Sequence, residues 1–236
     1  MSLKAVLFDF NGVIIRDEAI HEKLTAQILI EENLTLKPGE YKKMCLGRSD
    51  RTCLEDLLAS RGRVINQTYL TELLKRKALM YASELEKIEK LPLYAGLDDF
   101  IFQMRSRNIK LAIVSGAIHQ EIELVLNRSK LAEYFQVIVA GDDITTSKPE
   151  PDGYLLAVQR LNQEDPNLNL TPQECLVIED SLAGIQAAKK AGMRIVGVAN
   201  TYPFHILQRC CNWTVDYLNE LELERVQEVF SAKLSE

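Results

Sequence analysis

The sequence predicts an α/β protein, a doubly wound parallel sheet of the Rossmann type with an inserted domain of α-helices. Two observations lead to this fold class. Short apolar segments rich in β-branched residues recur along the chain, and the later ones alternate with helical patterns, as buried parallel strands joined by helices do. The stretch from Val13 to Leu111, in contrast, contains helical patterns alone. That length of chain is enough for a separate helical domain.

Each predicted element follows from its own pattern. Strands are predicted for the apolar segments 5–8, 111–114, 137–140, 176–178 and 195–198. Helices are predicted from apolar positions at helical spacing over 17–33, 50–60, 68–90, 97–106, 117–128, 151–162 and 181–191, and a polar helix over 217–236. Pro and Gly interrupt these patterns near residues 38 and 92. We therefore assign residues 1–14 and 93–236 to the α/β core, and residues 15–92 to the helical domain.

Composition excludes several classes of function. The 236 residues include 28 Lys+Arg and 34 Asp+Glu, a net charge of −6, which disfavours a surface for nucleic acid or for anionic lipids. No apolar run approaches the roughly 18 residues of a membrane span. The first residues enter a predicted strand directly, without the pattern of a cleavable leader. We expect a cytoplasmic protein that binds neither nucleic acid nor membrane, and the oligomeric state stays open.

The cysteines and the charged runs predict no site. The five cysteines include no C-x-x-C pair and no neighbouring histidines, and their number is odd. Both a zinc site and a disulfide framework are therefore disfavoured, and reduced thiols are predicted. The basic run Lys75-Arg76-Lys77 and the mixed charges of 84–90 are interpreted as solvated faces of a helix.

Polar side chains follow the predicted strands at the point where each strand ends. Asp9 follows the first strand, Ser115 the second, and Glu179 and Asp180 the fourth, while Lys148 lies in the loop after the third. Ligands of open parallel sheets bind at this edge. Three carboxylates at one edge need a cation, and their hard oxygen atoms suit Mg²⁺. Lys148, Ser115 and nearby backbone N–H groups suit a phosphoryl group, and Asp9 is placed to attack it.

Three motifs resemble those of the haloacid dehalogenase (HAD) superfamily, in its β-phosphoglucomutase-like branch with a helical cap. They are Phe8-Asp9-Phe10-Asn11-Gly12-Val13-Ile14, Lys148-Pro149-Glu150-Pro151-Asp152, and the segment 179–193 that begins Glu179-Asp180-Ser181. The resemblance spans most of the chain. It implies that Asp9 is the nucleophile and forms an aspartyl-phosphate, and that Ser115 and Lys148 hold the phosphoryl group. It also implies that Mg²⁺ is bound by Asp9, the backbone carbonyl of Asn11 and Asp180, with Glu179 near the metal.

The same resemblance implies where the substrate binds. The inserted helices correspond to a cap that closes over the site and selects the substrate. The segment 47–51 resembles the specificity loop of the family, and His21 stands where the family often has a histidine at the entrance of the cap. The expected substrate-binding residues are His21, Gly47, Arg48, Ser49, Arg51, Gly116 and Ala117.

The sequence departs from the family at several positions. Asn11 stands where phosphatases and mutases of the family carry a second Asp, which transfers a proton to the leaving alcohol. General acid–base catalysis is worth roughly 10²–10⁴-fold, and an amide cannot supply it. Asp50 lies near the position of the arginine that holds the second phosphate in the mutases, and Asp17 occurs where the family commonly has Ser. Either a group such as Asp17 or His21 supplies the proton, or catalysis is impaired.

The leading hypothesis is a Mg²⁺-dependent phosphatase that acts through Asp9 on a small phosphorylated metabolite such as a sugar phosphate. The alternatives are a β-phosphoglucomutase-like phosphohexomutase and a catalytically impaired protein that binds a phosphorylated ligand. A hydrolytic dehalogenase is disfavoured because it needs no metal. A phosphonate-cleaving enzyme would need a cap lysine that forms a Schiff base, and neither Lys42 nor Lys43 stands out in that role.

Overall fold

A parallel six-stranded sheet forms the centre of the protein. The computed structural model describes residues 2–232. The strand order is β3-β2-β1-β4-β5-β6, and every neighbouring pair is parallel. The strands are β1 (Ala5–Phe8), β2 (Lys110–Val114), β3 (Val137–Val139), β4 (Cys175–Glu179), β5 (Arg194–Val198) and β6 (Trp213–Val215). The predicted doubly wound α/β class is therefore confirmed. The edge strand β6 was not predicted, because Trp213-Thr214-Val215 is interrupted by a polar residue and only its last residue is buried.

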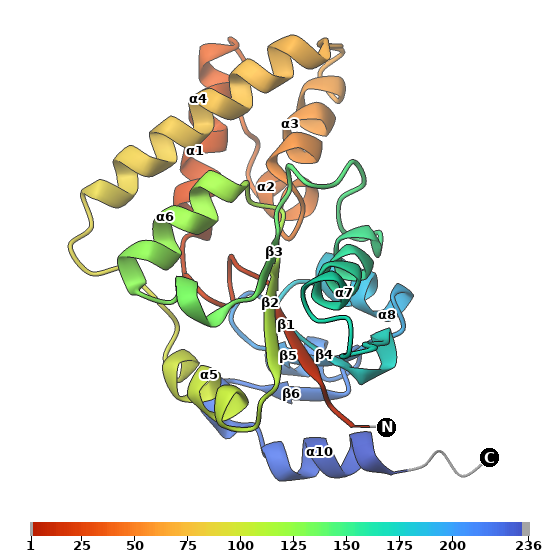
Figure 1. Cartoon of the computed structure of the whole chain (residues 1–236). Coiled ribbons are helices and arrows are strands. Elements are labelled where there is room, and N and C mark those ends of the chain that lie inside the picture. Colours follow the sequence, from red (N-terminus) through yellow and green to blue (C-terminus); the bar gives the residue numbers. More distant parts are fainter. Residues whose placement is uncertain (1, 233–236) are drawn as a thin grey trace.

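Helices cover both faces of the sheet (Figure 1). The first four helices after β1 are α1 (Glu18–Glu31), α2 (Glu40–Met44), α3 (Asp50–Ala59) and α4 (Gln67–Glu86). The others are α5 (Leu97–Ser106), α6 (His119–Ser129), α7 (Asp152–Glu164), α8 (Leu182–Lys190), α9 (Phe204–Leu207) and α10 (Leu223–Ser231). Among the described residues, we find no helix that is both long and apolar enough to cross a membrane.

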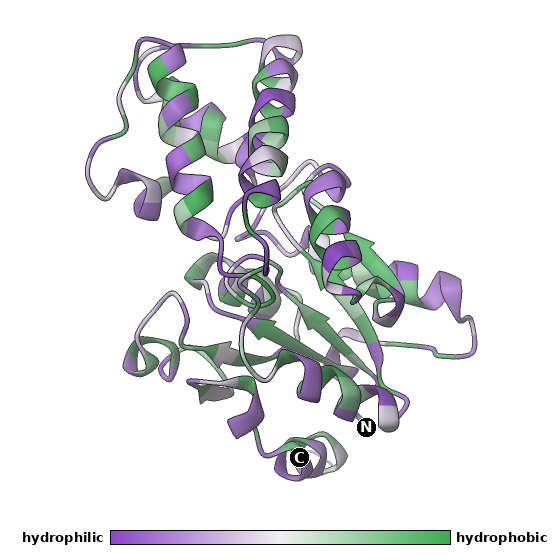
Figure 2. Ribbon diagram, turned by 90° about the vertical axis from the view of Figure 1, so that its left-hand side faces the viewer, coloured by the Kyte–Doolittle hydropathy of each residue, from purple (hydrophilic) through white to green (hydrophobic). Residues whose placement is uncertain are grey.

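The sheet separates two apolar layers. Side chains from α5, α6 and α10 pack on one face, and side chains from α7, α8 and α9 pack on the other. Because both faces are covered, all four residues of β1 are fully buried, and the central strands have no polar side (Figure 2). This arrangement leaves only the ends of the strands free to carry polar chemistry.

The helices α1 to α4 rise above the carboxyl edge of the sheet and have an apolar core of their own (Figure 1). Side-chain caps begin two of them: Ser49 accepts a hydrogen bond from the backbone N–H of Thr52, and Asn66 accepts one from that of Tyr69. Helix α2 was not predicted, since it has only five residues and follows the break at Gly39. The division into a core and a cap at residues 15 and 92 stays a prediction.

Two predictions about the chain were wrong. Cys45 and Cys53 form a disulfide, although reduced thiols were predicted. No pattern in the sequence indicates this pair, because only the folded turn between α2 and α3 brings the two Cα atoms to 4.6 Å. The C-terminal segment was predicted as one polar helix over 217–236. The helix spans only α10 and buries Leu223, Val226 and Phe230, while residues 233–236 lie outside the described part of the chain.

Candidate active site

The carboxyl edge of the sheet brings Asp9, Lys148 and Glu179 into direct contact. Asp9 directly follows β1, Glu179 is the last residue of β4, and Lys148 lies in the loop after β3. The ammonium of Lys148 donates to Asp9 Oδ1 at 2.8 Å and to Glu179 Oε1 at 2.6 Å. All three side chains are almost completely buried. The ends of β1 and β4, which were predicted to lie at one edge, are therefore linked by Lys148.

Burial makes this cluster electrostatically demanding. Loss of water and the neighbouring Glu179 raise the pKa of Asp9 to about 7, although Lys148 acts in the opposite direction. The pKa of Asp180 is raised well above its usual value, mainly by burial and then by Glu179 and Asp9. Burial disfavours the charged form of Lys148, but Asp9 and Glu179 outweigh it and raise its pKa. At this edge of the sheet three carboxylates, those of Asp9, Glu179 and Asp180, thus share the single ammonium of Lys148.

Glu179 is held by donors from the protein on both of its oxygen atoms. Oε1 accepts from Lys148 and from the hydroxyl of Tyr154, which lies 2.9 Å away. Oε2 accepts from the backbone N–H groups of Asp180 and Ser181 and from the Ser181 hydroxyl, at 3.0–3.1 Å. These bonds fix the orientation of Glu179 and, through it, the position of Lys148 beside Asp9.

The loop after β1 requires a glycine next to Asp180. Gly12 has a φ of +82°, which L residues rarely adopt. A Cβ at this position would lie 2.0 Å from Asp180 Oδ2. Asn200 donates to the carbonyl of Gly12 at 2.6 Å and holds the turn from the other side. The motif that begins at Asp9 therefore folds back tightly enough to place Asp9 and Asp180 at one cavity.

The segment after β2 also reaches this cavity. Gly116 and Ala117 line it together with Asp9 and Asn11. The backbone N–H of Ala117 donates to Ser115 Oγ at 3.0 Å, so the buried hydroxyl is oriented by the turn that follows it. Ser115 itself lies beside Lys148 in an adjoining small cavity.

The loop between α2 and α3 supplies some of the expected substrate-binding residues and not others. Gly47 and Arg48 line the cavity, and a Cβ on Gly47 would lie 2.4 Å from Ser181 Oγ, so the loop packs directly on the core. Ser49 lies outside the cavity lining, where it caps α3 and donates its backbone N–H to Ser147 Oγ at 2.9 Å. Arg51 points elsewhere and donates to Gln67 Oε1 at 2.6 Å.

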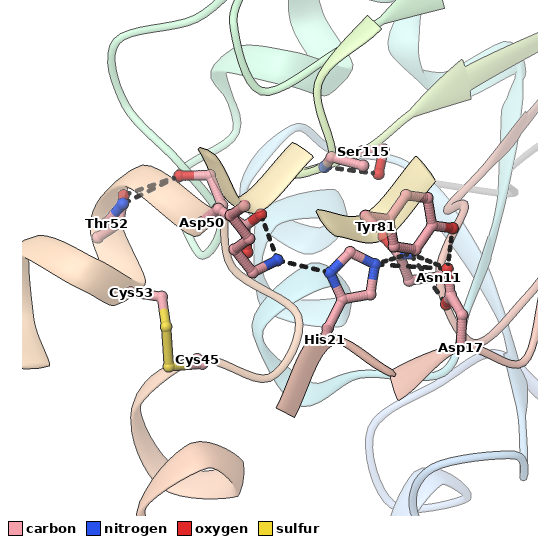
Figure 3. A network of polar contacts seen from close by, with 12 residues as sticks. Asn11, Asp17, His21, Cys45, Asp50, Thr52, Cys53, Tyr81 and Ser115 are labelled. Carbon is pink, nitrogen blue, oxygen red and sulfur yellow. Dashed lines mark hydrogen bonds and ion pairs between the residues drawn. A yellow bond between two sulfur atoms is a disulfide. The ribbon is translucent and has the colours of Figure 1, made fainter. Parts of the chain in front are cut away.

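Asn11 is tied to the helical insertion by its side chain. Its amide nitrogen donates to both carboxylate oxygens of Asp17 at 3.0 Å, and it lies 3.2 Å from His21 Nε2. Asp17 also accepts from the hydroxyl of Tyr81, whose ring stacks on His21. Figure 3 shows the His21 ring between Asn11 on one side and Asp50 on the other. Burial and Lys77 oppose protonation of His21, but Asp17 outweighs them and the pKa of His21 is raised.

The network continues to Lys77, which sequence reasoning missed. Lys77 was interpreted as part of a solvated face, yet it is fully buried. Its ammonium donates to Asp50 Oδ2 at 2.6 Å and lies 2.7 Å from His21 Nδ1. The available signal was its position in the helix, because Lys77 shares the face of Leu73 and Tyr81, four residues away on either side. A lysine on an apolar face needs a buried partner, and Asp50 provides it.

Comparison with known proteins identifies the family. The model of the family "Haloacid dehalogenase-like hydrolase" matches residues 6–198. The chain is 29% identical over 224 residues to the β-phosphoglucomutase of Bacillus subtilis, with 92% of this chain and 95% of that protein covered. It is 27% identical over 201 residues to a phosphorylated carbohydrates phosphatase of Thermotoga maritima, with 84% and 87% covered.

A solved structure agrees with the fold. CbbY of Rhodobacter sphaeroides, solved in complex with xylulose 1,5-bisphosphate, superposes with a TM-score of 0.79 at 24% identity, covering 94% of this chain and 97% of that one. The chain therefore belongs to the haloacid dehalogenase-like hydrolases, as its motifs predicted, and it is an enzyme of the phosphatase kind within that family.

Proposed function

We propose that the protein is a Mg²⁺-dependent phosphatase that acts on a small phosphorylated metabolite, such as a sugar phosphate, through an aspartyl-phosphate on Asp9. The observation that carries this proposal is the placement of Asp9. Its carboxylate is buried at a strand end, contacts Lys148, and shares one cavity with Asp180 and the turn after β2. The family and the phosphatase among its relatives support the same reaction class.

The residues of the edge fit a magnesium ion. Asp9 and Asp180 offer carboxylate oxygens within 4.8 Å of each other and of Glu179, and burial together with Glu179 raises the pKa of both aspartates. Asp9, Asp180 and the backbone carbonyl of Asn11 would hold the ion, and Glu179 would support the site through its hydrogen bonds to neighbouring donors. When bound, Mg²⁺ neutralises negative charge on the phosphoryl group and on the carboxylates.

The residues of the chain then divide the reaction into two displacements. Lys148, Ser115 and the N–H groups of the turn at Gly116 hold the phosphoryl oxygens. A carboxylate oxygen of Asp9 attacks phosphorus, the bond from phosphorus to the ester oxygen breaks, and that oxygen leaves with a proton. Water then attacks the phosphorus of the aspartyl-phosphate and loses a proton. This second step breaks the bond to Asp9 and releases inorganic phosphate.

The proton for the leaving group has to come from a neighbour of Asn11. The amide of Asn11 is occupied by Asp17 and cannot transfer a proton in the useful range. Asp17 and His21 are the titratable groups that contact this amide, and His21 lines the cavity. We propose that one of these two groups carries the proton.

The insertion acts as a cap in this proposal. The cavity between it and the core has a volume of about 40 Å³, whereas sites for small organic ligands span roughly 300–1,000 Å³. A sugar phosphate enters only if residues 15–92 move away from the core. Closure of the cap afterwards excludes bulk water from Asp9.

A second candidate function rests on the same asparagine. Because Asn11 replaces the proton-transferring Asp, a protein that binds a phosphorylated ligand and turns it over slowly or not at all is the alternative. A phosphohexomutase is less well supported, since Asp50 occupies the region where a second phosphate would need a cation and is itself paired with Lys77.

Phosphate release from a panel of sugar phosphates, with and without Mg²⁺, tests the proposal. The wild-type protein is expected to release phosphate only with Mg²⁺, and Asp9→Asn is expected to abolish the release. Asn11→Asp is expected to change the rate by less than about tenfold because Asp17 or His21 already carries the proton, whereas restoring a missing general acid would raise it by roughly 10²-fold or more. Exposed Glu86→Gln in α4 serves as the control variant. Turnover that persists in Asp9→Asn would contradict the proposal, and turnover in Asn11→Asp alone would favour the ligand-binding alternative.

A further inference from the structure

We infer that the substrate is a phosphate monoester whose leaving group carries hydroxyl or amino groups and no second acidic group. This inference rests on the proposed phosphatase function and concerns the half of the cavity that lies under the cap. We call that half the cap-side pocket and define it by Glu18, His21, Tyr41, Arg48 and Asp50, which line the cavity together with the carboxylates of the core.

The charges of the cap-side pocket do not suit a second anion. Asp50 and Glu18 contribute carboxylates to it. The ammonium of Lys77 is fully buried against Asp50 and His21, so the ion pair is satisfied without a ligand. A phosphate or carboxylate brought into this pocket would face Asp50 before it met a cation.

The arginine of the pocket is also engaged. One terminal nitrogen of Arg48 donates to the carbonyl of Met44 and the other pairs with Asp56, both at 2.8 Å. Its Nε is buried and has no hydrogen-bond partner among residues 2–232. Because Arg48 is already paired with Asp56, it brings no uncompensated positive charge to the pocket, and its free Nε–H can donate to a hydroxyl oxygen of a ligand.

Unsatisfied acceptors in this region call for donors on the ligand. Glu18 Oε1 is buried at the cavity without a partner in the described chain. Glu121 lies behind the pocket and outside its lining, and it adds a further buried carboxylate with one oxygen within 4.8 Å of polar atoms of Asp50 and His21. Buried acceptors without donors are costly, and hydroxyl or ammonium groups would satisfy them. The arrangement therefore matches a polyol or an amino sugar.

A matched series on one carbon scaffold tests the inference. We would measure kcat/KM for phosphate release, with Mg²⁺, from glucose 6-phosphate, glucosamine 6-phosphate, 6-phosphogluconate and glucose 1,6-bisphosphate. The second compound adds an ammonium group, the third a carboxylate and the fourth a second phosphate. The first two are expected to be better substrates than the last two by about tenfold or more, since like charges at close range in a buried site repel strongly.

Two variants connect that ranking to Asp50. Asp50→Asn keeps the shape of the side chain and removes its charge, so it is expected to reduce the preference against the two acidic compounds by about tenfold. Glu86→Gln removes one charge from an exposed position of the same cap and is expected to leave the ranking unchanged. Thermal-shift titrations are expected to rank the four compounds by affinity in the same order, and this measurement does not depend on turnover.

The outcomes separate this inference from the function on which it rests. If 6-phosphogluconate or glucose 1,6-bisphosphate is the best substrate or the tightest ligand, the inference is wrong and the phosphatase function stands. The inference is also overturned if Asp50→Asn leaves the preference unchanged. If neither the wild-type protein nor Asn11→Asp releases phosphate from any compound, and none binds, the proposed function fails and the inference with it.

Discussion

The replacement of Lys77 by methionine is expected to destabilise the protein by about 3 kcal/mol. Methionine has a similar length and fills the same apolar space, so the change removes charge more than volume. The Asp50 carboxylate then loses an ion pair of 2.6 Å, and His21 Nδ1 loses a neighbour at 2.7 Å. Breaking one side of a buried ion pair costs roughly 3–5 kcal/mol. The lower end applies because the Asp50 side chain keeps 18% of its exposure, so water can partly solvate it.

Urea unfolding at pH 7.5 measures this loss, and Lys75→Met provides a matched control on the same helix. Lys75 is exposed, so its replacement is expected to change the free energy of unfolding by no more than about 0.5 kcal/mol. The double variant Lys77→Met/Asp50→Leu removes both charges and is expected to recover at least half of the loss. A Lys77→Met protein within about 1 kcal/mol of the wild type would refute the reasoning.

The pH dependence gives a second test. Burial opposes ionisation of Asp50, but Lys77 and His21 outweigh it and lower the pKa of Asp50 below its usual value. A lowered pKa contributes stability that is fully present above the unfolded value of about 3.9 and is lost as the pH falls through the folded value. The part of the difference between wild type and Lys77→Met that comes from Asp50 is therefore expected to persist down to about pH 5 and to shrink below about 4.

Three other results are expected. Replacing Cys45 and Cys53 by alanine removes the link that closes a short loop. It should lower the free energy of unfolding in urea by about 2.5 kcal/mol without reductant, and by much less relative to reduced wild type. Gly12→Ala should lower the melting temperature and weaken Mg²⁺ binding in calorimetry, because its Cβ would overlap Asp180. Saturating Mg²⁺ should stabilise the wild-type protein by about 2.7 kcal/mol at 100 times its Kd, and Asp180→Asn should remove this thermal shift.

Most of the fold could be predicted because the central strands are buried on both sides. Segments such as β1 and β4 are continuously apolar, and their pattern is read without knowledge of the partners. The edge strand β6 and the short helix α2 could not be found in this way, since neither is a continuous run of buried apolar residues. The disulfide between Cys45 and Cys53 depends on a turn that only the folded insertion defines.

The site was predictable where it depends on the sheet and not where it depends on the cap. Asp9, Lys148 and Asp180 follow strands, and parallel strands bring their ends to one edge whatever else the chain does. Lys77 lies many residues away on a helix, and it meets Asp50 and His21 only because the insertion packs in one particular way. Arg51 shows the converse. Its position in the loop sequence predicted a substrate-binding residue, but its side chain donates to Gln67 instead.

Asn11 and Asp17 are best understood as a pair. The family commonly has Asp at the position of Asn11 and Ser at the position of Asp17. In this chain the carboxylate therefore stands at the second of these positions instead of the first. In this chain the two side chains are in contact, since the Asn11 amide donates to both oxygens of Asp17 at 3.0 Å. A second aspartate at position 11 would place two carboxylates at that distance, and they would share a proton. The exchange therefore removes a repulsion while it leaves an acidic group beside the same point of the cavity, so an asparagine here is no evidence by itself that proton transfer has been lost.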